Sequence, residues 1–207
     1  MLELITGITL AASAGLNAYI PLLGLGLLSR FTGLVQLPDA WAWLENGWSL
    51  GIIGVLLAVE VLVDKFPVLD TVNDVLQTVV RPASGGMVFA AGSSSETVAI
   101  SDPAGFVASA QFWPFVLGIA IALVPHLLKA VARPVINALT GGAGAAATSF
   151  LEDLGALVLT LLAVVVPVLA IVLLIAIIVL LVRRLRRARL RRREQRAGAA
   201  GVAAPPA

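Results

Sequence analysis

Four apolar runs dominate the chain, and each is long enough to form a helix across a bilayer. A hydrocarbon core of about 30 Å requires about 20 residues in helical form. The second run carries one acid, Glu60, and the third carries one ionisable side chain, His126. The pattern therefore predicts an all-α protein with four transmembrane helices, at Leu4–Ser29, Asn46–Val63, Pro103–Leu128 and Leu154–Val182.

The region between the second and third runs has a different pattern. Val68–Val80 has apolar residues at helical spacing, which predicts an amphipathic helix. Its narrow polar stripe consists of Asp70, Asp74, Gln77 and Arg81. This stripe either complements the helix dipole or lines a watery cavity. The glycine-rich segment Ser84–Gly92 is too short to span and fits a re-entrant loop or a tight packed turn.

In the first run, Gly7, Ala11 and Gly15 recur at four-residue spacing, which allows close helix–helix approach. We interpret this run as a single retained helix and not a signal peptide, because Glu3 replaces the usual basic residues.

Composition restricts the class of protein. Apolar residues make up 59% of the 207 residues and charged residues 13%, whereas soluble domains average about 45–50% and 25%. This composition argues against a soluble enzyme. The absence of cysteine excludes a disulfide scaffold as well. The chain is expected to be an integral membrane protein.

Charge divides the chain into a transmembrane domain, residues 1–182, and a tail, residues 183–207. The tail holds nine of the fourteen basic residues and one acid. Next to an apolar helix, such a run indicates a cytoplasmic anchor on anionic lipids, in preference to nucleic-acid binding. With four crossings, both termini would be cytoplasmic, in a bacterial inner membrane.

An internal similarity relates Leu50–Asp74 to Leu117–Gly141. Each copy is an apolar helix that gathers ionisable residues near its end and is interrupted by proline, at Pro67 and Pro134. Since the second and third crossings are consecutive, a true repeat would have inverted topology, as in many small transporters. Parallel duplication and chance similarity are the alternatives.

Charged side chains inside a bilayer are costly and usually face protein or water. Glu60 and Asp64 share one helix face, and His126, Lys129 and Arg133 share another. One hypothesis is an ion-pair network that fixes packing. The other is an anion site at Lys129 and Arg133, with Glu60 or His126 exchanging a proton.

Other polar residues complete the candidate site. Asn17 and Tyr19 interrupt the first run and are candidate substrate contacts, and Asp64, Asp70 and Asp74 are candidates for gating or for holding a cation. One histidine and no cysteine leave no zinc-type ligand set. We predict no cofactor, and a metal site on Asp70 and Asp74 has little support.

Three segments together resemble one bacterial membrane family, known as domain of unknown function 4126. They are Ala14–Pro21, Glu60–Asp70 and His126–Arg133, and Ser149–Asp153 also resembles the family's element that opens the last helix. The resemblance covers roughly residues 2–182 and omits the tail. It implies a membrane protein and brings no activity.

Three functions remain as hypotheses. The first is a small transporter or flippase-like protein for an anionic or phosphate-bearing solute or lipid. The second is a non-transporting membrane scaffold or assembly partner, for instance within a homo-oligomer, in which the same charges are packing pairs. The third is a metal-dependent lipid-modifying enzyme.

Overall fold

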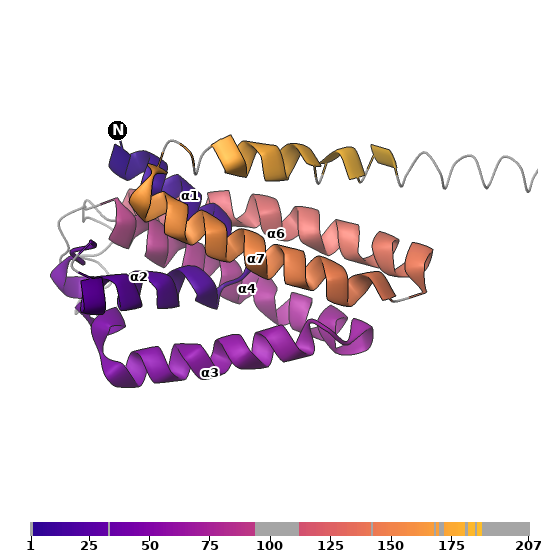
Figure 1. Ribbon diagram of the computed structural model, residues 1–207, viewed down its shortest axis with the longest axis horizontal. Helices are drawn as coiled ribbons and strands as arrows, with labels where there is room; N and C mark the ends of the chain where they lie inside the picture. Colours follow the sequence, from indigo (N-terminus) through magenta and orange to yellow (C-terminus); the bar gives the residue numbers. More distant parts are fainter. Residues whose placement is uncertain are drawn as a thin grey trace, which may run out of the picture.

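The regular structure in the described part of the chain is entirely helical (Figure 1). The computed structural model describes residues 2–32, 34–93, 112–141, 143–167, 169, 172–180, 182–184 and 186–187. Within them α1 (Leu2–Leu16), α4 (Pro67–Gly92), α6 (Phe112–Thr140) and α7 (Ala143–Val165) pack together. The fold class predicted from the apolar pattern is confirmed.

The first predicted crossing is not one helix. It is divided at Asn17 into α1 and α2 (Tyr19–Thr32), and α2 turns back toward the end of the bundle where α1 begins (Figure 1). Ser13 on α1 and Gly24 on α2 accordingly both lie against Thr160 of α7. Asn17 causes the break, because its side-chain oxygen accepts hydrogen bonds from the backbone N–H groups of Tyr19 and Ile20 and so caps a new helix.

The helix predicted for the second crossing has nearly the predicted bounds. A 3-10 helix, η1 (Asp39–Glu45), precedes α3 (Gly47–Val63), and the Asn46 side chain caps α3. A short turn at residues 64–66 then connects α3 to α4. Phe66 has extended backbone angles and Pro67 is the first residue of α4, an arrangement that proline favours at a helix start.

The predicted amphipathic helix is only the first half of α4. The helix continues through Pro82 and the glycine-rich segment to Gly92, so that segment is neither a re-entrant loop nor a turn. Packing overrides the low helix propensity of glycine here. A side chain at Gly85 would collide with Ala122, and one at Gly118 on α6 would collide with the Gly85 carbonyl. The glycines let α4 and α6 approach closely.

The small-residue stripe on α1 serves the same purpose, as its spacing predicted. A side chain at Gly15 would collide with the Ala122 carbonyl and the ring of Pro125 on α6, and one at Gly7 would press on Phe89 of α4. α1 therefore lies in close contact with both helices, at the centre of the bundle.

The last two predicted crossings have different boundaries in the structure. α6 runs from Phe112 to Thr140, and residues 103–111 of the predicted crossing lie outside the described residues. α7 ends at Val165, close to Pro167, because proline cannot continue a helix without losing a hydrogen bond. Helical residues 172–180 follow, so the fourth predicted crossing is divided.

By length and composition, two described helices can cross a membrane, namely α6 and residues Gly144–Val165 of α7. α3 adds a third if it is joined to η1, which is bent from it by 65°. These apolar helices are those of a membrane protein, but the predicted number of four crossings is not confirmed.

Figure 1 also shows how the ends of the helices are arranged. The N-terminal end of α1 lies at one end of the bundle, and the α3–α4 and α6–α7 connections lie at the other.

The two copies of the internal similarity differ, since Pro67 begins α4 whereas Pro134 lies inside α6. The proline interruption expected in both copies occurs only in the first.

Candidate functional site

Seven charged side chains from four helices and one turn meet inside the bundle. We call them the charged cluster, and they are Glu60 on α3, Asp64 in the α3–α4 turn, Asp74 and Arg81 on α4, Lys129 and Arg133 on α6, and Glu152 on α7. Five of them are 2% exposed or less, and the side chains of Asp74 and Glu152 are 14% and 12% exposed. The acidic and basic faces predicted on neighbouring helices therefore do pair.

Arg81 forms one centre of the cluster. Its Nη2 atom lies 2.9 Å from a Glu60 oxygen and 3.7 Å from an Asp64 oxygen, and its Nη1 atom lies 3.5 Å from Asp74. Arg81 is fully buried, and α4 continues beyond it to Gly92. The interpretation of Arg81 as a charge that complements the end of its helix is therefore wrong.

A second centre links α6 to the α3–α4 turn and to α7. Lys129 Nζ lies 2.9 Å from Asp64 and 3.1 Å from Glu152, and Arg133 Nη2 lies 3.2 Å and 2.7 Å from the same two carboxylates. The other Asp64 oxygen accepts a hydrogen bond from Asn73 at 2.8 Å. Asp64 and Glu152 thus both bridge the two cations.

The described residues of the polar stripe on α4, namely Asp74, Gln77 and Arg81, face this interior, and the apolar side of the first half of α4 faces outward. Gln77 and Arg81 are 3% and 0% exposed, whereas Val75 and Val79 are 71% and 73% exposed. In a bilayer the outward apolar side would meet lipid, and only protein or trapped water can satisfy the polar stripe.

His126 lies beside the Arg81 centre. Arg81 Nη1 lies 3.4 Å from His126 Nδ1, and His126 Nε2 lies 3.1 Å from the Thr78 hydroxyl. Because arginine can only donate, Nδ1 accepts in this arrangement, and the imidazole is neutral. A second proton would have to sit at Nδ1, directly against the guanidinium.

Glu60 is a better candidate for holding a proton. One of its carboxylate oxygens accepts a hydrogen bond from Arg81, while the other, Oε2, is buried without a hydrogen-bond partner among the described residues. A protonated carboxyl group tolerates such surroundings much better than a carboxylate does. The predicted proton role of Glu60 thus has a geometric basis that His126 lacks.

The remaining predicted residues are placed unevenly. Asn17 is fully buried, caps α2 and donates a 2.9 Å hydrogen bond to Asp153 on α7. The Tyr19 side chain contacts Gln77 and lies close enough to Glu60 to interact with it. Asp74 belongs to the cluster, whereas the Asp70 side chain lies outside the described residues.

The cluster contains four carboxylates and three cations, so its formal charge is −1 when every group is ionised. For Asp64, which follows the α3 span, burial raises the pKa, but Lys129, Arg133 and Arg81 together lower it below its ordinary value. Buried ion pairs rarely stabilise a protein more than packed apolar residues would. The cluster therefore calls for an explanation beyond stability.

The position of the cluster along the helices is also informative. Asp64 lies at the α3–α4 end of the bundle, while Arg81 lies near the middle of α4 and His126 near the middle of α6. The charges thus form a continuous path from one end of the bundle to its midplane.

The structure limits what this site can bind. Lys129 and Arg133 both have carboxylate partners, so an anion that binds these cations competes with Asp64 and Glu152. Among the described residues, no group of three or more His, Asp or Glu side chains is arranged to hold a metal ion. The metal-dependent enzyme therefore gains no support from this part of the chain.

Sequence reasoning placed Arg81 on the polar stripe with Asp74 but did not include it among the site residues. It also missed Glu152 and Asp153 as members of the site or its surroundings. Glu152 and Asp153 belong to the segment Ser149–Asp153, which was expected to open the last helix. The structure contradicts that expectation, because α7 begins at Ala143 and Ser149 is buried inside it.

A sequence profile for a domain of unknown function, number 4126, matches residues 4–187. The match includes every member of the charged cluster and the described part of the tail. No curated protein and no solved structure matches the chain significantly.

Proposed function

Because the chain belongs to the family of domain of unknown function 4126, whose description assigns no activity, we propose a function from the charged cluster itself. The protein is a small proton-coupled membrane transporter, or a flippase-like protein, for an anionic or phosphate-bearing solute or lipid. The observation that carries the proposal is a buried cluster in which each substrate-binding cation already has a carboxylate competitor.

In this proposal Lys129 and Arg133 alternate between two sets of partners. At rest they bind Asp64 and Glu152, at 2.7–3.2 Å. An entering anion takes the place of these carboxylates, and a released carboxylate takes up a proton. One monovalent anion with one proton leaves the cluster at −1, which avoids the large cost of changing net charge in a low-dielectric interior.

Glu60 and Arg81 form the inner end of the path. One Glu60 oxygen has no hydrogen-bond partner among the described residues, and this supports a role in receiving the proton near the middle of the bundle. Asp74, 3.5 Å from Arg81, and Asp64 are positioned to gate movement between the end of the bundle and Glu60. Asn17 and Tyr19 border the same interior at the α1–α2 break, where substrates of many transporters bind.

The charge of the tail suggests an orientation. Basic residues flanking a span favour the cytoplasmic side, and the described residues of the tail lie toward the same end of the bundle as the α3–α4 and α6–α7 connections (Figure 1). We therefore assign that end of the bundle, and the Asp64 end of the charged path, to the cytoplasm. The N-terminal end of α1 then faces the opposite side, a revision of the expectation of two cytoplasmic termini.

The alternative function is a scaffold in which the charges only fix helix packing. Its support is the completeness of the pairing, since each cation of the cluster has at least two carboxylates within 4 Å. A scaffold needs the helices to stay together but needs no exchange of partners. The two functions therefore differ in what a charge-preserving substitution does.

The test uses purified protein in liposomes. Vesicles containing a trapped pH-sensitive dye receive an inward gradient of inorganic phosphate, and acidification of the lumen is measured with the membrane potential clamped. A second arm measures movement of fluorescent phosphatidylglycerol between leaflets by chemical quenching. Acidification in the first arm supports transport of a solute, and movement of phosphatidylglycerol in the second arm supports transport of a lipid. Rates equal to protein-free vesicles in both arms contradict transport.

The matched variant is Asp64→Asn with Lys129→Met, which removes one ion pair and keeps the cluster at −1. We expect it to insert and fold but to lose the activity. Lys65→Met, which removes an exposed cation one residue beyond Asp64, is the control and should transport normally. If the double variant transports as well as the control, the assignment of Lys129 to the substrate is wrong.

A further inference from the structure

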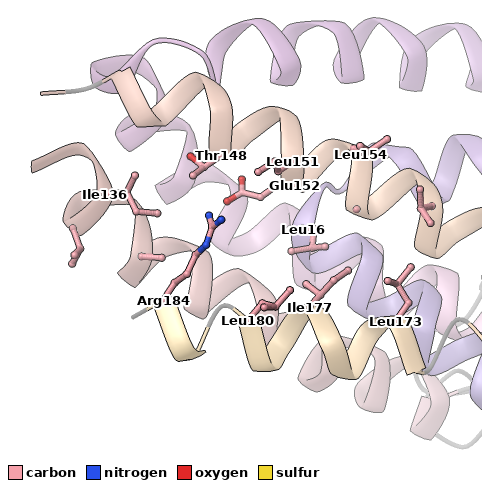
Figure 2. Close-up of a pocket in the computed structure, with 14 residues that line it drawn as sticks. Leu16, Ile136, Thr148, Leu151, Glu152, Leu154, Leu173, Ile177, Leu180 and Arg184 are labelled. Atoms are coloured by element: carbon pink, nitrogen blue, oxygen red, sulfur yellow. The ribbon is translucent and has the colours of Figure 1, made fainter. Parts of the chain in front are cut away.

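An apolar groove of about 460 Å³ lies between α7, α6, the end of α1 and the helical residues 172–180 and 182–184 (Figure 2). This volume falls in the range of about 300–1,000 Å³ that small-molecule sites occupy. Most of its wall consists of aliphatic side chains, among them Leu16, Leu154, Leu173, Ile177 and Leu180. Such a wall suits a hydrocarbon chain.

One end of the groove is polar. Thr148, Glu152 and Arg184 line it, and Figure 2 shows the Arg184 side chain directed toward the other two. Glu152 is already paired with Lys129 and Arg133, so its charge is offset. Arg184 is exposed, as are its neighbours Arg183, Arg186 and Arg187. Arg184 therefore supplies an accessible positive charge at the polar end, and the other three arginines lie outside the lining but close to Arg184 in the sequence.

The two ends of the groove lie at different depths. The aliphatic end reaches Leu16, the last residue of α1, beside the break in the middle of the bundle. The polar end lies where the cationic tail begins. A phospholipid has the same polarity along one leaflet, with its headgroup at the interface and its acyl chain reaching toward the midplane. Positive charge at the cytoplasmic surface specifically attracts anionic lipids.

We propose that this groove is a binding site for an anionic phospholipid of the cytoplasmic leaflet, with one acyl chain along the aliphatic wall and the phosphate at Arg184. The assignment to the cytoplasmic leaflet rests on the orientation proposed above. The site itself does not depend on transport, because a lipid can occupy the groove whether or not the protein moves it. The headgroup lies next to Glu152 and hence next to the charged cluster.

Gly155 offers a way to fill the groove. A Cβ atom there would lie 3.7 Å from the tips of Leu16 and Ile177, at ordinary contact distance, so a larger side chain enters the groove without striking backbone. Gly155→Leu is therefore expected to fold and to exclude the acyl chain. Gly51→Leu on α3, where nothing lies within 4 Å, is the matched control.

The experiment uses the full chain in phosphatidylcholine nanodiscs that contain phosphatidylglycerol with a photoreactive acyl chain. Cross-linked peptides are mapped by mass spectrometry, and folding is checked by circular dichroism and gel filtration. We expect labelling concentrated at residues 148–158 and 173–180, retained in Gly51→Leu and lost in Gly155→Leu. Labelling spread evenly over exposed faces such as Val72–Val79, or unchanged in Gly155→Leu, overturns the proposal.

Competition with unlabelled lipids tests the headgroup. Phosphatidylglycerol should displace the probe better than phosphatidylcholine or oleate. Arg184→Gln should weaken that displacement about tenfold, the value of one charge-assisted hydrogen bond. Arg187→Gln, which lies outside the groove lining, should leave it unchanged. Equal displacement by phosphatidylcholine or oleate contradicts the assignment to an anionic phospholipid.

Discussion

Replacement of Arg81 by methionine is the most direct test of the charged cluster. Methionine preserves much of the volume of the side chain and removes its charge. The Arg81 side chain has no solvent exposure and lies within 4 Å of Glu60, Asp64 and Asp74. The substitution therefore changes the formal charge of the cluster from −1 to −2 without opening a path to solvent.

The loss of stability in Arg81→Met arises mainly at Glu60. Asp64 keeps Lys129 and Arg133 as partners, whereas Glu60 has no second cation within 4 Å among the described residues. Removing one partner of a buried ion pair typically costs about 3–5 kcal/mol, because the other charge stays buried without compensation. We expect Arg81→Met to lower the free energy of unfolding by about that amount.

A second substitution isolates the pair. Adding Glu60→Gln returns the cluster to −1 and removes the uncompensated charge, so the double variant should be more stable than Arg81→Met. A coupling energy of up to about 3 kcal/mol is expected for residues in direct contact. Lys65→Met serves as the control, since its cation is exposed and should change stability by about 0.5 kcal/mol or less.

The measurement is equilibrium unfolding in mixed micelles, followed by circular dichroism as the fraction of denaturing detergent increases. Refolding from the denatured end establishes reversibility. Two results would refute the reasoning. One is an Arg81→Met midpoint equal to that of Lys65→Met. The other is a double variant whose loss equals the sum of the two single losses, which would mean that Glu60 and Arg81 do not interact.

Three further predictions concern the fold. Asn17→Ala should lower the free energy of unfolding by about 0.5–2 kcal/mol in the same assay, because α2 loses its cap. Asn17→Asp keeps a capping oxygen but should still lower stability, because the new carboxylate faces Asp153. An unchanged midpoint in both variants contradicts the role of Asn17. Gly118→Val should cost about 1–3 kcal/mol or more by separating α6 from α4, while Gly51→Val stays near the parent, and equal losses would argue against the close helix approach. Since the chain has no cysteine, Glu3→Cys and Lys65→Cys can each be labelled with an impermeant maleimide in sealed vesicles. The arrangement of the helix ends predicts that the two cysteines lie on opposite sides of the membrane. Labelling of both from the same side would contradict this arrangement.

The apolar pattern was sufficient for the fold class and for much of the helix placement. The length of the second run predicted α3 closely, because a lipid-facing helix must be apolar along its whole length. Four-residue spacing of Gly7, Ala11 and Gly15 correctly predicted close approach. These features are local, so a single segment of sequence contains the physical cause of each.

Errors occurred where a local signal competed with packing. Asn17 was taken as a polar interruption within one helix, whereas it caps a new helix and also bonds to Asp153 of α7. The glycines after Pro82 indicated a re-entrant loop or a turn, and contact with α1 and α6 made them helical. The cap at Asn17 is a local signal, but the contacts with α7, α1 and α6 join residues far apart in the sequence, and no local pattern identifies them.

The charged cluster was predicted in part for the same reason. The sequence placed Glu60 with Asp64 and Lys129 with Arg133, because helical spacing alone puts each pair on one face. It could not pair Glu60 with Arg81, or Lys129 with Glu152, since those contacts depend on which helices become neighbours.

The sequence by itself determined that this chain lies in a membrane, that its helices carry a few charges at depth, and that its basic residues gather in the tail. Those properties follow from composition and spacing, because hydrocarbon imposes the same cost wherever a charge lies. The tertiary structure alone decided the reversal at Asn17, the central position of Arg81 and the groove beside Gly155. Each of these requires surfaces from separate helices to meet, and that outcome depends on shape and packing in three dimensions.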